Sequence, residues 1–310
     1  MTSTTSIAVY GAGGVGAYFG GRLALAGADV TLIARGDHLE ALRSGGLRVE
    51  SVHGDFEVDL PATDDPADIG PVDYLLVCVK SFDTETLDLD PLVGEDTCVI
   101  SLQNGVSNEP ILADAVGEGR VLGGVCYILS TIKEPAVIEH TGGPARIVFG
   151  ELDGTVTGRA ERFRDLCERA EIDVELSADV RVDMWEKFAF IVAHAGMTAA
   201  VRLPLGPIRD SEASWAMYER LMREVETVAV AEGAPLPEDA VGRWLGDVAE
   251  FDADAYSSLH YDMTHGKRME LDAFHGTVLD LADEHGTDVP ACEAIYAILE
   301  PWAVRNARGE

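Results

Sequence analysis

Short apolar runs alternate with amphipathic stretches along the first half of the chain, which is the pattern of strands and helices in turn. Runs long enough for strands occur at residues 7–10, 30–34, 74–79, 97–102, 121–129 and 145–149. Two further runs, 47–51 and 56–60, flank a Val-His-Gly-Asp connection and predict a hairpin. Since strands that alternate with helices build parallel sheets, we predict an α/β fold with a doubly wound, Rossmann-type sheet.

From about residue 180 the apolar positions recur with the period of helices. Helical patterns cover residues 182–200, 212–232, 237–251, 276–284 and 290–302, and a polar run near 259–274 is included among them. A chain of 310 residues is long enough for two domains of ordinary size. We therefore predict a Rossmann domain over residues 1–178 and an all-helical domain over residues 179–310.

Acidic residues outnumber basic ones, 55 to 23, and the resulting net charge of −32 is spread along the whole chain. Nucleic-acid binding is disfavoured because phosphate contacts need a basic face. Such an excess without an acidic block is typical of an extreme halophile, where concentrated salt screens the self-repulsion. Only four basic residues are lysines, at positions 80, 133, 187 and 267, so each is a candidate for a specific role.

Targeting and redox features favour a cytoplasmic protein. The N-terminus has neither a basic segment nor a long apolar one, and no uncharged stretch reaches the roughly 18 residues that a membrane span needs. The five cysteines are scattered without a CxxC pair, which predicts buried thiols in a reducing compartment and no zinc site. His260 and His265 lack a third ligand at metal spacing, so no metal is expected.

A Gly-x-Gly-x-x-Gly sequence directly follows the first strand and opens a helix. In this context the first glycine allows a tight turn, the second lets a pyrophosphate approach the backbone, and the third lets helix and strand pack closely. The N–H groups at the start of the helix then bind phosphate. The residues predicted to bind a dinucleotide are Gly11, Ala12, Gly13, Gly14, Val15 and Gly16.

The end of the second strand bears on which nucleotide is bound. Sites for NAD usually place a carboxylate there, whereas this chain has Arg35, whose guanidinium can grip a 2′-phosphate. The position favours NADPH. Asp37 lies nearby, so use of NADH stays open, and Arg35 could instead stack on adenine or merely solvate the strand end.

Two more polar residues follow strands at the edge where ligands bind in such sheets. Lys80 comes after the strand at 74–79, where it can contact the cofactor or serve only as a solvated strand-end charge. Asn104 follows the next strand, and its amide can bridge cofactor and substrate. An Asn-Gly turn is also common without any ligand, so both interpretations of Asn104 stay open at this point.

Lys187 lies near the start of a helix that is otherwise apolar almost all round. Partial burial would lower its pKa toward the range where a lysine donates a proton to a developing alkoxide. The alternative is a snorkelling lysine paired at the surface. His194 shares this helix face and could replace Lys187 as the acid, although such a histidine is more typical of a core. Glu270, in a later polar segment, could accept a hydrogen bond from a substrate hydroxyl or could belong to a solvated helix face.

These residues resemble the ketopantoate reductase (2-dehydropantoate 2-reductase) family over nearly the full chain. The resemblance lies in several segments taken in order: residues 7–21 with YFGGRLA, 30–42 (TLIARGDHLEAL), 79–82, 102–105, 185–187, 202–206 (RLPLG) and 257–272. It implies a Rossmann domain followed by a helical domain, with the active site between them and NADPH as the cofactor. The reaction implied is reduction of 2-dehydropantoate to pantoate, a precursor of coenzyme A in pantothenate biosynthesis.

The resemblance also implies roles for individual residues. The glycine loop falls on Gly11, Gly13 and Gly16, the residue that selects the 2′-phosphate on Arg35, and the crevice lysine on Lys80. Asn104 would lie near nicotinamide and substrate, and Lys187 would be the general acid. Ser258 would bind the substrate carboxylate, and Glu270, twelve residues later, would bind a substrate hydroxyl.

The chain departs from the family at two positions. Well-characterised members carry asparagines four and eight residues after the lysine, where this chain has Ile191 and Ala195. Losing these hydrogen-bond partners favours one alternative, an NADP-dependent reductase of another branched 2-keto acid on the same scaffold. A non-catalytic NADPH-binding sensor is a second alternative, against which the presence of Lys187 and Glu270 argues. The sequence also leaves the oligomeric state open, a homodimer included.

Overall fold

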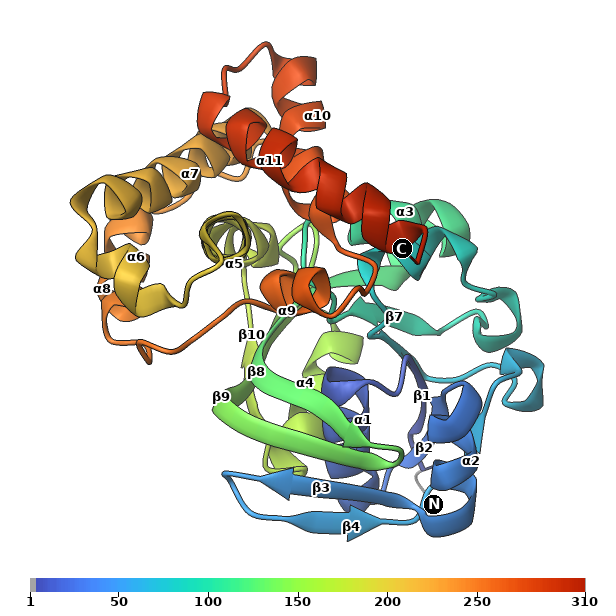
Figure 1. Ribbon diagram of the computed structural model, residues 1–310. Helices are drawn as coiled ribbons and strands as arrows, with labels where there is room; N and C mark the ends of the chain where they lie inside the picture. The colour runs from blue at the N-terminus through green and yellow to red at the C-terminus, as the bar shows by residue number, and fades with distance from the viewer. Residues whose placement is uncertain (1–3, 310) are drawn as a thin grey trace. The chain divides into compact units, whose positions relative to one another are not determined.

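The structure is a computed structural model that describes residues 4–309, and the chain divides into two compact units. The first unit runs to Gln103 and resumes over Asn108–Val180. The second contains the short segment Asn104–Ser107 together with the chain from Arg181 onward. Figure 1 shows the strands in the first unit and the helices α5 to α11 in the second.

A single sheet of ten strands forms the centre of the first unit. Its spatial order is β4-β3-β9-β8-β7-β6-β1-β2-β5, and β10 pairs with β9. Strands β5, β2, β1, β6, β7 and β8 are mutually parallel, which confirms the predicted doubly wound sheet. The strands are β1 (Ser6–Tyr10), β2 (Asp29–Ile33), β3 (Leu47–Ser51), β4 (Phe56–Val58), β5 (Ala62–Thr63), β6 (Tyr74–Val77), β7 (Cys98–Ser101), β8 (Val121–Glu134), β9 (Val137–Glu151) and β10 (Asp173–Leu176).

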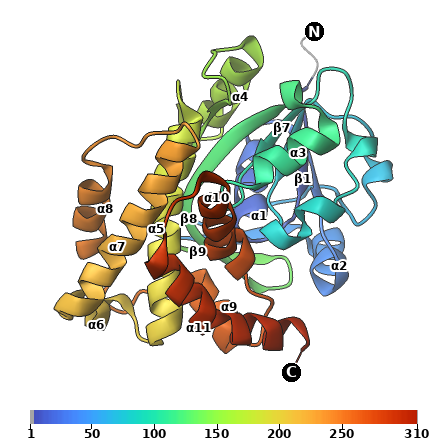
Figure 2. The ribbon, with the colours of Figure 1, turned by 90° about the horizontal axis from the view of Figure 1, so that it is seen from above.

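Side chains that alternate along the strands build a separate core on each face of the sheet. On β1, Ile7 and Val9 join a core that also holds residues of α1, α2 and α4, whereas Ala8 and Tyr10 join the core beneath α3. Figure 2 shows α1 and α3 lying against the sheet. The helices are α1 (Gly14–Leu25), α2 (Gly36–Gly45), α3 (Asn108–Val116) and α4 (Gly158–Arg169), with 3-10 turns at Pro66–Asp68, Ser81–Thr86, Asp90–Leu92 and Glu118–Arg120.

Two strands are much longer than the apolar runs predict. β8 and β9 pair antiparallel over 14 and 15 residues, and their ladder continues into a two-stranded ribbon in which Leu129 and Ile132 of β8 are exposed, whereas Ile138 of β9 is buried. Ala136, with φ of 61°, turns the chain between them. In the ribbon Lys133 forms ion pairs with Glu50 and Glu139, so one of the four lysines is engaged in surface pairing. The predicted hairpin at 47–51 and 56–60 is confirmed by β3 and β4.

The second unit is helical. Its elements are α5 (Val180–Val201), α6 (Leu205–Asp210), α7 (Glu212–Ala231), α8 (Ala240–Ala249), α9 (Ser258–Thr264), a π-helical turn (Asp272–Gly276), α10 (Thr277–His285) and α11 (Pro290–Ala307). Figure 2 shows α8 beside α7, and α6 at one end of α7. None of the helices in the described residues has an apolar stretch long enough to cross a bilayer.

The prediction of one helical run near 259–274 is wrong. α9 ends at Thr264, and Gly266, with φ of +65°, turns the chain out of helical geometry. An irregular segment follows before the π-helical turn begins at Asp272. Its backbone is held partly by Asn306 of α11, whose side-chain amide donates to the carbonyls of Met263 and Lys267.

Candidate active site

The glycine loop between β1 and α1 has the geometry that a pyrophosphate site needs. Gly11 has φ of +101°, and a Cβ there would lie 2.8 Å from the backbone nitrogen of Val79. A Cβ on Gly16 would lie 2.2 Å from the carbonyl oxygen of Gly11, so helix and loop touch at this point. A Cβ on Gly13 would meet no atom within 4 Å. The loop therefore packs tightly on the protein side and is open beside Gly13.

The N-terminus of α1 fits a bound phosphate. Gly13, at the N-cap position, offers no side chain to the first N–H groups, and the first turn contains no acidic residue. These N–H groups and the positive end of the helix dipole attract an anion. The residues present thus fit the diphosphate of a dinucleotide.

His38, which the sequence analysis did not single out, fastens this loop to the rest of the unit. Its Nδ1 accepts a hydrogen bond from the backbone N–H of Ala136 at 3.1 Å. The proton must therefore be on Nε2, which donates to the carbonyl oxygen of Ala12 at 2.8 Å. Burial lowers the pKa of His38, which favours this neutral tautomer. A lone histidine in a polar helical stretch gives no sequence signal for this role.

Three candidate residues follow neighbouring parallel strands. Gly11 follows β1, Arg35 directly precedes α2 after β2, and Lys80 precedes the Ser81–Thr86 turn after β6. Because parallel strands end at one edge of a sheet, these residues share the ligand-binding edge. Arg35 is exposed and Lys80 is half-buried.

In the second unit a hydrogen bond connects Lys187 and Asn104, two candidate residues that are 83 positions apart in the sequence. Lys187 lies two turns into α5 and is half-buried, and its Nζ donates a hydrogen bond to Asn104 Oδ1 at 3.0 Å. The lysine nitrogen is therefore held by a second candidate residue. Asn104 belongs to the short segment that the second unit takes from the first half of the chain.

The neighbouring carboxylate, Glu186, is engaged by α8. It accepts hydrogen bonds from Arg243 at 3.1 and 3.2 Å and from the Trp244 indole at 3.1 Å. The Trp244 ring stacks on Phe190, one turn further along α5, with ring centroids 4.5 Å apart. These contacts fix the rotation of α5 about its axis and so help to orient Lys187.

The later candidates lie on α9 and in the irregular segment after it. Ser258 is the exposed first residue of α9, whereas its neighbour Ser257 is buried and forms a 2.7 Å hydrogen bond with Thr198 of α5. Glu270 is buried, with 5% of its surface exposed, which contradicts a solvated helix face. His194 is also buried, and burial lowers its pKa to about 4, so it is a neutral core residue.

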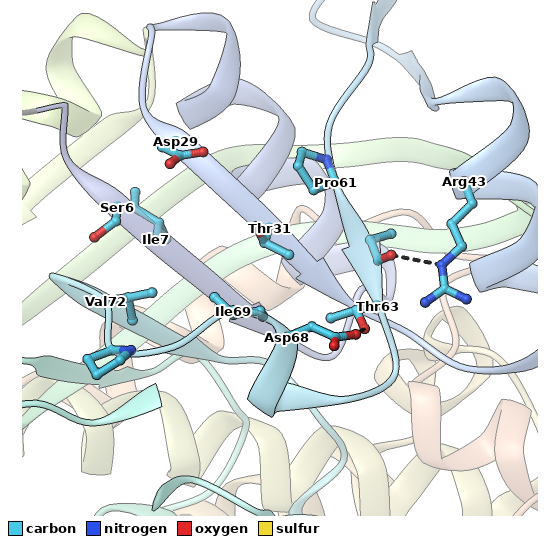
Figure 3. Close-up of a pocket in the computed structure, with 12 residues that line it drawn as sticks. Ser6, Ile7, Asp29, Thr31, Arg43, Pro61, Thr63, Asp68, Ile69 and Val72 are labelled. Atoms are coloured by element: carbon cyan, nitrogen blue, oxygen red, sulfur yellow. Dashed lines mark hydrogen bonds between the residues drawn. The ribbon is translucent and has the colours of Figure 1, made fainter. Parts of the chain in front are cut away.

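One pocket lies away from all of these residues. It has a volume of about 420 Å³ and is lined by residues at the amino ends of β1 and β2, such as Ser6 and Asp29 (Figure 3). Arg43, which also lines it, donates to the carbonyl oxygen of Ala62 at 2.9 Å and pairs with Asp64. Since ligands bind at the carboxyl ends of such strands, this pocket is at the wrong edge for the dinucleotide.

Comparisons with known proteins cover both halves of the chain. The family model described as ketopantoate reductase PanE/ApbA matches residues 7–154, and the model of its C-terminal part matches residues 179–302. The 2-dehydropantoate 2-reductase of Archaeoglobus fulgidus is 33% identical over 91% of this chain and 92% of its own length. An uncharacterized oxidoreductase of Bacillus subtilis is 31% identical over 95% of this chain and 97% of its own.

Solved structures agree. A PanE/ApbA family ketopantoate reductase from Ralstonia eutropha has a TM-score of 0.90 at 32% identity and covers 98% of this chain and 100% of its own. The fold is shared more distantly by D-mandelate dehydrogenase in complex with NADH and anilino(oxo)acetate, with a TM-score of 0.87, 20% identity and coverage of 98% and 100%. The chain belongs to the ketopantoate reductase PanE/ApbA family of 2-dehydropantoate 2-reductase-like oxidoreductases.

Proposed function

We propose that this chain is an NADPH-dependent reductase that converts 2-dehydropantoate into pantoate, a step in pantothenate and coenzyme A biosynthesis. The observation that carries the proposal is the hydrogen bond between Lys187 and Asn104, in a chain that matches both family models. A proton donor for a keto group must be held in a fixed position, and the Asn104 amide holds the Lys187 ammonium in this way.

The cofactor assignment rests on the first unit. The open face at Gly13 and the uncapped start of α1 fit a diphosphate, and Arg35 supplies a cation where a ribose 2′-phosphate would lie. Lys80, on the same edge, would add a second cation. The structure of D-mandelate dehydrogenase, which shares the fold, holds NADH, so the choice between the two nucleotides is a point to test.

In the proposed reaction Lys187 supplies the proton. When bound, the reduced nicotinamide supplies a hydride to the keto carbon, and the carbonyl oxygen then carries negative charge. Lys187 Nζ donates a proton to that oxygen, which completes the hydroxyl group. Asn104 holds Nζ and orients it, Ser258 would bind the substrate carboxylate, and Glu270 would accept a hydrogen bond from the substrate hydroxyl.

A second substrate class is favoured by one specific feature. Ile191 and Ala195 lie one and two turns after Lys187 on α5, and their apolar side chains replace hydrogen-bonding partners. Sites that hydrogen-bond a substrate hydroxyl discriminate strongly, and sites that lack such partners do not. The alternative is therefore a reductase of another branched 2-keto acid.

The experiment is a panel of 2-keto acids, including 2-dehydropantoate, with NADPH and NADH, followed by the absorbance of the reduced nicotinamide. Highest kcat/KM on 2-dehydropantoate with NADPH supports the proposal, and highest kcat/KM on a different branched acid supports the alternative. Binding of NADPH without turnover of any acid would indicate a sensor and contradict both.

The role of Lys187 is tested with a matched lysine. Lys187→Ala should lower kcat about 100-fold or more, because general acids typically contribute 10²- to 10⁴-fold. Lys133→Ala removes the same group from the exposed ribbon, where it pairs with Glu50 and Glu139, and should leave kcat unchanged. Equal kcat values for the two variants would reject Lys187 as the acid.

A further inference from the structure

The short connection that carries Arg35, residues 34–37, is hydrogen-bonded to the glycine loop at both of its ends. At the first end, the carbonyl oxygen of Ile33 accepts hydrogen bonds from the backbone N–H groups of Gly11 at 3.2 Å and Ala12 at 3.1 Å. At the second end, His38 Nε2 donates to the carbonyl oxygen of Ala12 at 2.8 Å. The connection therefore begins and ends on the same residue of the loop.

The two anchors of the Arg35 connection differ in kind. The anchor at Ile33 is made by backbone atoms and continues the sheet, because Ala34 N–H donates to the carbonyl oxygen of Thr63 at 3.0 Å. The anchor at His38 is made by a side chain in the first turn of α2. A substitution at His38 therefore removes one anchor and leaves the other in place.

The position of Arg35 depends on the His38 anchor. Arg35 is the N-cap residue of α2, and its carbonyl oxygen accepts a hydrogen bond from Leu39 N–H at 3.4 Å, so it moves with the first turn of the helix. Gly36 has φ of +56°, and a Cβ there would meet no atom of the described residues within 4 Å. Because a glycine in open space leaves the backbone free to turn, the bond from His38 to Ala12 sets the separation between Arg35 and the loop.

The turn between β8 and β9 fixes the His38 ring from its other side. Ala136 N–H donates to His38 Nδ1 at 3.1 Å, so the ring is held between two backbone groups that belong to different segments. The same ribbon touches the start of α1, since a Cβ on Gly14 would lie 2.3 Å from the carbonyl oxygen of Ser130. The ring therefore cannot turn away from Ala12 without breaking its bond to the ribbon.

We propose that His38 is a positioning residue that sets the preference for NADPH over NADH. The diphosphate at the glycine loop and the 2′-phosphate at Arg35 belong to one nucleotide, so both contacts form together only at the right separation of loop and guanidinium. The bond from His38 to Ala12 holds this separation before the nucleotide binds, which lowers the ordering cost of binding. NADH has no 2′-phosphate and needs no such alignment. The inference rests on the proposed cofactor role of Arg35.

The test is the ratio of the Kd of NADH to the Kd of NADPH, each measured by nicotinamide fluorescence. His38→Ala should lower this ratio roughly fivefold by weakening NADPH binding, the effect expected for one neutral hydrogen bond. Equal weakening of both nucleotides would overturn the proposal, because it would indicate damage to the diphosphate site that they share. His53→Ala, which removes an exposed histidine of the same unit, is the matched control and should leave the ratio unchanged.

Two conservative variants separate the two hydrogen bonds of the ring. The side-chain NH2 group of glutamine lies near the place of Nε2 and can still donate to Ala12, whereas the oxygen of asparagine lies near the place of Nδ1 and can still accept from Ala136. His38→Gln should therefore keep the wild-type ratio, and His38→Asn should lower it as His38→Ala does. The reverse order would overturn the proposal. These two variants also replace His38→Ala if that variant does not fold.

A double-mutant cycle connects the effect to the 2′-phosphate. In an Arg35→Ala background, His38→Ala should cause no further change in the ratio, and an undiminished change would contradict the positioning role. If Arg35→Ala alone leaves the ratio unchanged, the 2′-phosphate assignment fails and the positioning role fails with it. If Arg35→Ala lowers the ratio but His38→Ala does not, the positioning role alone fails.

Discussion

Replacing Glu109 by glutamine should change how the stability of the first unit depends on pH. Desolvation raises the pKa of Glu109 from its usual 4.5 to about 8. Between these values the folded protein holds a proton that the unfolded chain has released, so the stability falls as pH rises. The slope is about 1.4 kcal/mol per pH unit, and the accumulated loss by pH 8 is at most roughly 5 kcal/mol. Glu109→Gln carries no such proton and should escape this loss.

The assay is urea unfolding at fixed high salt between pH 5 and pH 8.5, followed by circular dichroism. The free energy of unfolding of Glu109→Gln minus that of the wild type should increase steadily up to about pH 8 and then level off. Glu118→Gln removes an exposed carboxylate of the same unit and is the matched control variant. A flat difference for Glu109→Gln would refute the reasoning, because it would mean that Glu109 ionises as in the unfolded chain.

Two buried histidines make the stability of the folded protein rise with pH, which is opposite to the effect of Glu109. Burial lowers the pKa of His194 to about 4 and that of His275 to about 3, both from 6.5. Their folded forms bind fewer protons, so they add stability as pH rises toward 6.5 and nothing beyond it. Both histidines lie in the second unit, which also contains all four tryptophans. Tryptophan fluorescence therefore reports the unfolding of the second unit. The two histidines are present in both variants, so their contributions cancel in the difference.

Three further predictions concern cofactor, substrate and helix docking. Arg35→Ala should weaken NADPH binding about 10- to 100-fold, the contribution of a hydrogen bond to a charged group, and leave NADH binding nearly unchanged; equal losses in titrations of both would reject the 2′-phosphate assignment. Ile191→Asn with Ala195→Asn should shift kcat/KM toward 2-dehydropantoate if these positions set the substrate, and an unchanged ratio over the keto-acid panel would exclude them. Glu224→Ala should destabilise the second unit by about 2 kcal/mol in urea unfolding. The buried carboxylate accepts hydrogen bonds from the first N–H groups of α11, including that of Cys292 at 2.9 Å. A loss under about 0.5 kcal/mol would contradict this role.

The sequence predicts the features that depend on local pattern. The glycine loop is recognisable because a strand precedes it and a helix follows it within a few residues, and the comparisons confirm the family that these motifs indicate. The lengths of β8 and β9 are missed because apolar and polar residues do not alternate regularly in their outer parts, where Ile132 of β8 is exposed and both Ile138 and His140 of β9 are buried. The break after α9 is missed because a single glycine, Gly266, is a weak signal within a polar run.

Features that depend on tertiary contacts could not be predicted. His38 acquires its role only because the turn at Ala136 is brought to its ring from 98 positions away. Gln103 and Glu109 resemble ordinary turn and helix-start residues until the packing of α3 against β7 buries them (Figure 2). The role of Lys187 remains a prediction, although its contact with Asn104 now gives that prediction a geometric basis.

The segment Asn104–Ser107 has a consequence for dissecting the protein. The chain enters the second unit, leaves it after four residues and returns at Arg181, so a fragment starting there would lack the amide that holds Lys187. Adding the missing peptide in trans is unpromising, since ordering a free tetrapeptide costs more entropy than one hydrogen bond recovers. During synthesis Asn104 leaves the ribosome before Lys187 does. The hydrogen bond between them therefore requires no residue that is synthesised after Lys187.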